Sequence, residues 1–362
     1  MKVAFGANTY GYSDGGGHLW EYLNWALGLR ALGCEVVWIE RVPDGEGEER
    51  VAANEQALRE RLERYGLGTS LVFTNGAGSP EAAHGADLYL NLAYGPPLDL
   101  PGCRRRALVD IDPGLLQTWV DRGWLDIDGY DLYFTVGETV GRPGARFPDA
   151  GREWRYTPSC VALDHWPPEA PAPDSAYTTV SNWDTYDEWV EEDGEWYSND
   201  KKSGFLPFLD VPRLTGAPLE LALGLGSDGD EEQAELAARG WRVRDATEVA
   251  ATPWAYRDYI GASRGEFSCA KPSCIRMQNA WISNRTLCYL ASEKPAVVQH
   301  TGPSAFLPEA EGLFRFRTPE EAVAALEAAE SDYAGHGRAA RELVEERFDA
   351  QKVLTRVLEE AA

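Results

Sequence analysis

Positive charge, long apolar runs and histidine are all scarce in this chain of 362 residues. There are 34 Lys and Arg against 59 Asp and Glu, and the formal net charge of −25 argues against nucleic acid or an anionic membrane as a partner. No apolar run approaches the roughly 20 residues that a membrane span needs, so we predict no membrane-spanning helix. The chain opens as a strand followed by a Gly turn, which predicts a cytoplasmic protein without a signal peptide.

Cysteine is also sparse. Of the 6 Cys residues only Cys269 and Cys274 lie close together, and neither a Cys-x-x-Cys pair nor a His cluster accompanies them. This pattern favours reduced core thiols over disulfides or a metal site. We therefore predict no metal-ligand cluster and no required cofactor.

The hydrophobic and aromatic content is ample for more than one core. A chain of 362 residues with a hydrophobic fraction of 44% is long and apolar enough for two domains. Most of the 13 Trp and 16 Tyr fit core positions. Some also suit a cleft in which a sugar or a planar ligand stacks on an aromatic face.

Apolar strands alternate with helices through the first half of the chain. Helical periodicity over 19–32 stops at Gly33, and a charged helix over 46–65 stops at Gly66. This alternation predicts an α/β domain with a parallel, doubly wound sheet. The predicted strands are 2–7, 35–40, 71–74, 87–92, 106–111 and 131–136.

A Pro-rich segment separates two halves of the same type. Four prolines within 166–176 make this stretch unsuitable for a helix or a strand, so we interpret it as a linker. The second half restarts with a strand at 177–180 and continues with strands at 219–225, 241–243, 266–270 and 296–299. A long charged helix over 333–360 is predicted to end the chain.

The stretch 281–326 is the most informative part of the chain. Ser283 or Asn284 can cap a helix, a buried strand follows, and Thr301-Gly302 stand at its carboxyl end. Glycine there lets backbone approach a ligand closely. A helix start beside such a strand end forms a pocket for an anion, because helix N-termini carry partial positive charge.

The order and spacing of these elements resemble the donor-binding half of GT-B-fold glycosyltransferases. The segment 14–41, a Gly-Gly loop, a helix and a Gly-x-Glu-Val strand, resembles their N-termini. The resemblance implies two Rossmann-like domains facing a cleft. Residues 1–165 would bind the acceptor and residues 177–340 the nucleotide sugar. The C-terminal helix, here 341–362, often crosses back to the first domain in these enzymes.

The resemblance also implies a set of donor-binding residues. A Lys near the first strand of the second domain holds the diphosphate in retaining enzymes, which here is Lys202 or Lys201, and we choose Lys202 as the residue that assists at the diphosphate. Acids in the position of Glu309 and Glu311 bind the donor ribose or hexose in related enzymes. The remaining candidates for the diphosphate are Asn284, Arg285, Thr301, Gly302 and Ser304.

The Gly-rich turn after the first predicted strand is the second candidate site. Asp14-Gly15-Gly16-Gly17-His18 lies at the carboxyl edge of the predicted sheet, where ligands bind. The turn lacks the full Gly-x-Gly-x-x-Gly pattern, so NAD is a weaker alternative even though Glu40 could bind its ribose. Gly16 and Gly17 are candidates for contact with the acceptor.

Two titratable residues flank these glycines. His18 can act as a base near neutral pH, and inverting enzymes of this fold often use a His or Asp from this region to deprotonate the acceptor. Asp14 is the second candidate base. A capping or solvent-facing role remains the alternative for both residues.

A third candidate lies where another predicted strand ends, in the sequence Asp110-Ile-Asp112-Pro-Gly. Asp112 can orient sugar hydroxyls from this edge, or it can cap the helix that begins nearby. Gln117 and Trp119 on that helix would extend the acceptor wall. By contrast, 174–200 contains acids and no Lys or Arg, which indicates a solvated face.

These observations lead to one principal hypothesis. The protein transfers a sugar from a nucleotide diphosphate donor to a small or medium acceptor, without a required metal, although Mg²⁺ at the diphosphate stays open. Two alternatives remain: a nucleotide-sugar 2-epimerase or hydrolase on the same fold, and a non-catalytic two-domain sugar-binding protein. The sugar, the base, the acceptor, inversion or retention, and any homo-oligomer are left open.

Overall fold

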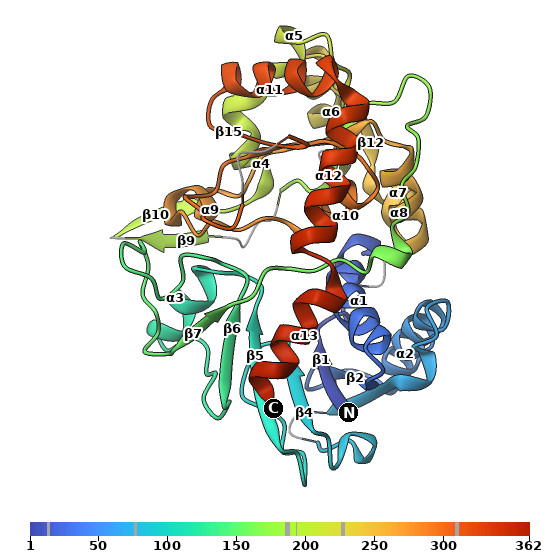
Figure 1. Ribbon diagram of the computed structural model, residues 1–362, viewed down its shortest axis with the longest axis vertical. Coiled ribbons are helices and arrows are strands. Elements are labelled where there is room, and N and C mark those ends of the chain that lie inside the picture. Colours follow the sequence, from blue (N-terminus) through green and yellow to red (C-terminus); the bar gives the residue numbers. More distant parts are fainter. Residues whose placement is uncertain (13–14, 76–77, 185–188, 193, 226–228, 308–310) are drawn as a thin grey trace. The chain divides into compact units, whose positions relative to one another are not determined.

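The computed structural model describes residues 1–12, 15–75, 78–184, 189–192, 194–225, 229–307 and 311–362 (Figure 1). The chain forms two compact units. The first comprises Met1–Ala162 and Arg347–Ala362, and the second Leu163–Glu346. Each unit contains one large parallel sheet with helices. The prediction of two doubly wound α/β domains is confirmed.

The sheet of the first unit has seven parallel strands in the order β3-β2-β1-β4-β5-β6-β7. The order reverses at β1, which pairs with β2 on one side and β4 on the other. Ligands bind at such a reversal, beyond the carboxyl ends of the strands. The strands are β1 (Lys2–Ala7), β2 (Glu35–Val42), β3 (Leu71–Asn75), β4 (Leu88–Asn91), β5 (Arg105–Asp110), β6 (Leu132–Thr135) and β7 (Trp154–Tyr156).

Four α-helices accompany this sheet within the described residues: α1 (Gly16–Ala31), α2 (Glu48–Glu63), α3 (Leu115–Asp121) and α13 (Ala350–Ala361). Helix α13 packs directly on α1. A Cβ atom added to Gly28 would lie 2.6 Å from both the Ala350 Cβ and the Leu354 Cδ1. The absence of a side chain at Gly28 therefore allows the C-terminal helix to lie against the first helix.

The prediction of one long helix over 333–360 is wrong. The structure has α12 (Tyr333–Arg347) in the second unit and α13 in the first. The break occurs where Val161 accepts a hydrogen bond from the Ala350 N–H (3.0 Å) and donates one to the Phe348 carbonyl (2.9 Å). Asp349 then caps α13 through the Gln351 N–H (3.0 Å). Asp349 therefore acts as an N-cap inside the charged run and starts a second helix. Helical periodicity alone did not reveal this break.

The sheet of the second unit has six parallel strands in the order β12-β11-β8-β13-β14-β15. They are β8 (Tyr177–Asn182), β11 (Leu219–Gly224), β12 (Arg242–Asp245), β13 (Gly265–Ser268), β14 (Ala296–Gln299) and β15 (Leu313–Phe316). Its α-helices are α4 (Lys201–Phe205), α5 (Val211–Leu214), α6 (Gly229–Ala238), α7 (Ala246–Ala250), α8 (Pro253–Ala262), α9 (Pro272–Met277), α10 (Asn284–Ala291), α11 (Pro319–Ser331) and α12. Among the described helices of either unit, none has both the length and the hydropathy of a membrane span.

The Pro-rich segment packs on the second unit. Trp166 is fully buried, and its carbonyl accepts a hydrogen bond from Arg341 (2.7 Å). Further along, the Ala172 N–H donates to the Ala262 carbonyl (3.0 Å). The first of the two boundaries between the units falls between Ala162 and Leu163. The predicted linker thus belongs to the body that follows it.

The acidic run contains a feature that the sequence did not suggest. Strands β9 (Trp189–Glu192) and β10 (Glu195–Ser198) form a two-stranded antiparallel sheet between β8 and α4. The run is solvated in part, as expected, but it also has regular backbone pairing. We refer to β9 and β10 as the hairpin.

Candidate functional site

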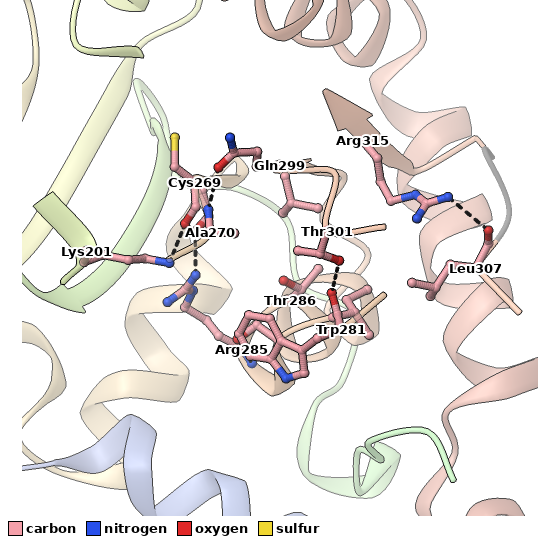
Figure 2. Close-up of a pocket in the computed structure, with 14 residues that line it drawn as sticks. Lys201, Cys269, Ala270, Trp281, Arg285, Thr286, Gln299, Thr301, Leu307 and Arg315 are labelled. Carbon is pink, nitrogen blue, oxygen red and sulfur yellow. Dashed lines mark hydrogen bonds between the residues drawn. The ribbon is translucent and has the colours of Figure 1, made fainter. Parts of the chain in front are cut away.

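A pocket lies in the second unit, at the carboxyl ends of β13 and β14 (Figure 2). The first turn of α10 forms one wall. Its cap is Ser283, whose hydroxyl accepts a hydrogen bond from the Arg285 N–H (3.2 Å). This is the helix start that the sequence predicted. The pocket is lined by Lys201, Ser268, Cys269, Ala270, Trp281, Ile282, Ser283, Arg285, Thr286, Val298, Gln299, Thr301, Leu307 and Arg315.

Arg285 lines this pocket, but its guanidinium is held by other groups. Its Nε donates to Glu266 (2.8 Å), and its terminal nitrogens donate to the Val180 carbonyl (3.0 Å) and the Ser268 hydroxyl (2.6 Å). Burial disfavours the charged form, but the fully buried Glu266 carboxylate, together with Tyr256 and Tyr289, outweighs it, so the pKa of Arg285 is raised. Arg285 therefore ties α10 to β8 and β13 beneath the pocket.

Lys201 supplies the buried cation of the pocket wall. The residue is only 6% exposed, and its ammonium donates to the Cys269 carbonyl. Burial, followed by the charge of Arg285, lowers the pKa of Lys201 to about 7. A buried amine of this kind gains from an approaching anion, because the anion favours the protonated form.

Lys202 is placed differently from Lys201. Its ammonium pairs with Glu232 (2.5 Å), and it is not part of the pocket wall. Successive residues of a helix point roughly 100° apart, so only one of two neighbouring lysines can enter a given pocket. The sequence analysis chose Lys202, but it is Lys201 that lines this pocket.

Arg315 is a pocket residue that the sequence analysis missed. It lies in β15, and its guanidinium donates to the Gly302 carbonyl (3.4 Å) and the Leu307 carbonyl (3.3 Å). Figure 2 shows Lys201 and Arg315 on opposite sides of Thr301, with the Arg315 guanidinium directed toward Leu307. A basic residue inside an apolar edge strand was the available signal.

The loop after β14 is fastened by its own residues. The Thr301 hydroxyl, in the pocket wall, donates to the Trp281 carbonyl (2.5 Å). Gly302 has φ +143°, and a Cβ there would lie 2.5 Å from the Gln278 carbonyl oxygen. We expected this glycine to let a ligand approach the backbone closely. In the structure, the absence of a side chain at Gly302 instead lets the loop pack closely against the backbone at 278–280. The Ser304 hydroxyl accepts from the Phe306 and Leu307 N–H groups (3.1 and 2.7 Å) and closes a turn.

Two further donor candidates, Asn284 and Glu311, do not line the pocket. Asn284 is buried in the first turn of α10, where its carbonyl oxygen accepts a weak bond from the Cys288 thiol (3.7 Å). Glu311 is exposed before β15, and Glu309 lies outside the described residues. The structure therefore brings Arg285 and Thr301 together with Lys201.

The first unit places His18 in the first turn of α1, half-buried. Its Nε2 lies 2.7 Å from the Asn8 carbonyl, and its ring centroid is 4.0 Å from that of Tyr12. Burial lowers the pKa of His18, and the Asn8 carbonyl and the Asp112 charge oppose this in part. A neutral imidazole that donates from Nε2 keeps its lone pair on Nδ1, so Nδ1 can accept a proton.

Asp112 belongs to the same neighbourhood. Its carboxylate accepts a hydrogen bond from the Tyr94 hydroxyl (2.7 Å), and its N–H donates to Asp110 (2.9 Å). Gly114 is the N-cap of α3, so the alternative that Asp112 caps this helix is wrong. The Asp112 charge raises the pKa of His18, so the carboxylate lies within electrostatic range of the ring.

Glu21 is a further member that the sequence analysis did not single out. It follows His18 by one helical turn, so both side chains lie on one face of α1. Burial, and then the Asp112 charge, raise the pKa of Glu21 to about 8. His18, Glu21 and Asp112 thus form one cluster of titratable groups.

The other acceptor candidates support the fold around this cluster. Gln117 is fully buried, donates to Asp110 (2.7 Å) and accepts from the Gly114 N–H (2.5 Å). Trp119 packs against the core of the first unit. Gly16 and Gly17 begin α1, and Asp14 lies outside the described residues.

No protein-family model and no curated protein sequence matches this chain. Solved structures do match. Sucrose-phosphate synthase from Thermosynechococcus elongatus has a TM-score of 0.56 at 12% identity, covering 100% of both chains. An α-glucosyltransferase in complex with UDP and mismatched DNA has a TM-score of 0.61 at 10% identity, covering 100% of this chain and 99% of that one. HepE from Anabaena in complex with UDP has a TM-score of 0.55 at 11% identity, covering 99% of each chain. The two parallel α/β units described above thus have the GT-B fold of these proteins.

Proposed function

We propose that this protein is a glycosyltransferase that moves a sugar from a nucleoside diphosphate donor to a small or medium acceptor. The observation that carries the proposal is the pocket of the second unit, where the buried Lys201 faces the start of α10 at the ends of β13 and β14. Structures of the same fold support it, since an α-glucosyltransferase is described with UDP and HepE with UDP and glucose.

The pocket is suited to a diphosphate. The N–H groups in the first turn of α10 and the cations of Lys201 and Arg315 provide positive charge from several directions. As the bond between the sugar and the diphosphate breaks, negative charge grows on the leaving oxygen. Fixed dipoles and cations that stabilise this charge usually supply the largest catalytic contribution. Because these cations and N–H groups would stabilise the negative charge of the leaving diphosphate, we propose that transfer requires no metal ion.

The first unit would prepare the acceptor. In an inverting reaction the acceptor oxygen bonds to the anomeric carbon, the bond to the diphosphate oxygen breaks, and the acceptor proton passes to Nδ1 of His18. Asp112 would then stabilise the imidazolium, since its charge already acts on this ring. This role of His18 applies if the anomeric configuration of the product is inverted relative to that of the donor.

A reducing compartment is consistent with the thiols. None of the six cysteines forms a disulfide in the structure, and three of them are buried. Free thiols persist in the cytoplasm, where disulfides are rare. We therefore propose a cytoplasmic protein that acts on soluble nucleotide sugars.

Thermal stabilisation by a panel of UDP, GDP, dTDP, ADP, CMP and NAD tests the donor site. We expect one nucleoside diphosphate to raise the melting temperature by several degrees, because stabilisation grows with ligand concentration over Kd. Lys201→Met should reduce the shift, and Lys202→Met is the matched control that should retain it in full. A flat panel, or a response to NAD alone, would refute the proposed donor site.

Product analysis with the stabilising donor tests the chemistry. Transfer of the sugar to an added acceptor supports the proposal. Equal donor consumption with and without an acceptor would identify a hydrolase or a 2-epimerase instead. Sugar binding with no nucleotide affinity would identify a binding protein.

A further inference from the structure

The hairpin presents two different faces. Residues directly opposite each other across an antiparallel pair lie on the same face, and side chains alternate along each strand. Val190 pairs with Tyr197, and Glu192 with Glu195, which defines an inner face. Glu191 pairs with Trp196, and Trp189 with Ser198, which defines the outer face.

The inner face of the hairpin already holds a cation. The guanidinium carbon of Arg276, from α9, lies 4.1 Å from the centre of the Tyr197 ring. The same guanidinium lies 3.6 Å from a Glu192 oxygen and 4.0 Å from a Glu195 oxygen. An aromatic ring and carboxylates thus share one arginine, which combines cation–π attraction with ionic pairing.

The outer face carries the same types of groups, and its two indole rings are more than half exposed. Trp189 is 55% exposed and Trp196 61% exposed, although large aromatic side chains usually bury most of their surface. Glu191 lies opposite Trp196, and its carboxylate accepts a hydrogen bond from the Gly194 N–H (2.5 Å), which fixes its position. Two indole rings and a held carboxylate therefore share one face.

The charge of the surroundings favours a cationic occupant. The sequence from 174 to 200 contains no Lys or Arg, and the whole chain has a net charge of −25. A positively charged side chain would therefore not be repelled by any cation within 174–200, and the negative charge of the chain would speed its association.

We propose that the outer face of the hairpin docks an arginine side chain presented by a partner protein. Arginine fits better than lysine because its planar guanidinium stacks on an indole and pairs with a carboxylate at the same time. A protein fits better than a small ligand because small ligands usually require a concave pocket, whereas these indoles are more than half exposed. Exposed Trp residues of this kind are typical anchors of protein interfaces. The inference is independent of the proposed sugar transfer.

A labelled Arg-Ser repeat peptide is the probe, and its binding to the full chain is followed by fluorescence anisotropy at physiological salt. The double variant Trp189→Ala/Trp196→Ala should bind roughly five- to thirtyfold more weakly, the loss expected for two exposed cation–π contacts. Glu191→Gln should also weaken binding. A Lys-Ser peptide should bind less tightly than the Arg-Ser peptide.

Two matched controls separate this face from general charge attraction. Trp124 is also 61% exposed, and Trp124→Ala should leave peptide binding unchanged. Glu49→Gln removes one charge from an exposed helix position in the first unit and should leave it unchanged too. Circular dichroism of each variant confirms that it is folded.

Three results would overturn the proposal. One is equal peptide affinity in the wild type and the double Trp variant. Another is selective binding of free arginine amide with no gain from the peptide, which would assign the face to a small cationic ligand. The third is self-association that is lost in the double variant, which would assign the face to a second copy of the chain.

Discussion

Replacing Lys201 by methionine removes the buried cation from the pocket wall and keeps the length of the side chain. In the folded protein the pKa of Lys201 is lowered from 10.5 to about 7, chiefly by burial. At about 1.4 kcal/mol per pKa unit, this difference lowers the free energy of unfolding by roughly 5 kcal/mol when the amine is protonated in both the folded and the unfolded state. An amine that destabilises the empty protein so strongly is expected at a site that binds an anion.

The sign of the pH dependence follows from the proton count. Between about pH 7 and 10.5 the unfolded chain keeps the proton on this amine and the folded chain releases it. The free energy of unfolding of the wild type should therefore rise with pH in this window, and the variant Lys201→Met should lack this rise. Near neutral pH the variant should melt at a higher temperature than the wild type. Urea unfolding at several pH values from 7 to about 9 measures both effects.

Ligand binding should show the opposite trend. A diphosphate that requires the protonated amine should bind up to about tenfold more weakly for each pH unit above 7, because the proton must be taken up. Lys201→Met should remove this slope and weaken binding near neutral pH by roughly ten- to a hundredfold, the value of a hydrogen bond between charged groups. Trp281 lines the pocket, so quenching of tryptophan fluorescence can report binding.

The neighbouring residue provides the control. Lys202→Met breaks a partly exposed pair with Glu232, for which we expect a change below about 1 kcal/mol and an unaltered pH slope. If Lys201→Met binds the nucleotide as tightly as the wild type, or keeps the slope, the assigned role of the buried amine is wrong.

Three further substitutions have defined outcomes. Burial lowers the pKa of His18, and a base must be unprotonated to accept a proton, so transfer should be lost as the pH falls through that pKa. His18→Ala should remove this acidic limb from the pH profile of kcat/KM. An unchanged profile would exclude His18 as the base. Gly302→Ala should cost about 1–3 kcal/mol in urea unfolding because of its φ of +143°, whereas Gly11→Ala, with open space around it, should change stability little. Glu266→Gln should destabilise the fold by about 3–5 kcal/mol, since it leaves the guanidinium of Arg285 buried without its carboxylate; a loss below 1 kcal/mol in the same assay would contradict this account.

Local sequence patterns were sufficient to predict much of the architecture. Strands β1 and β14 begin and end where apolar periodicity placed them, and α10 begins at the predicted cap. Such features depend on neighbouring residues alone: alternation of apolar positions, glycine at helix ends and a serine before a helix. Short or irregular elements were missed for the same reason. Strand β7 has three residues, and the hairpin lies in an acidic run where composition indicated only solvation.

The site depended on contacts between residues that are distant in the chain. Sequence alone placed Arg285 at a helix start, but only the folded sheet shows that Glu266 holds its guanidinium below the pocket.

Likewise, two adjacent lysines look alike in the sequence until α4 directs Lys201 into the pocket and leaves Lys202 with Glu232. Composition and periodicity therefore determined the fold class, the order of the elements and the edge of each sheet where ligands bind. The direction of each side chain, its ionic partner and its degree of burial were decided by tertiary packing, because these properties depend on which strands become neighbours.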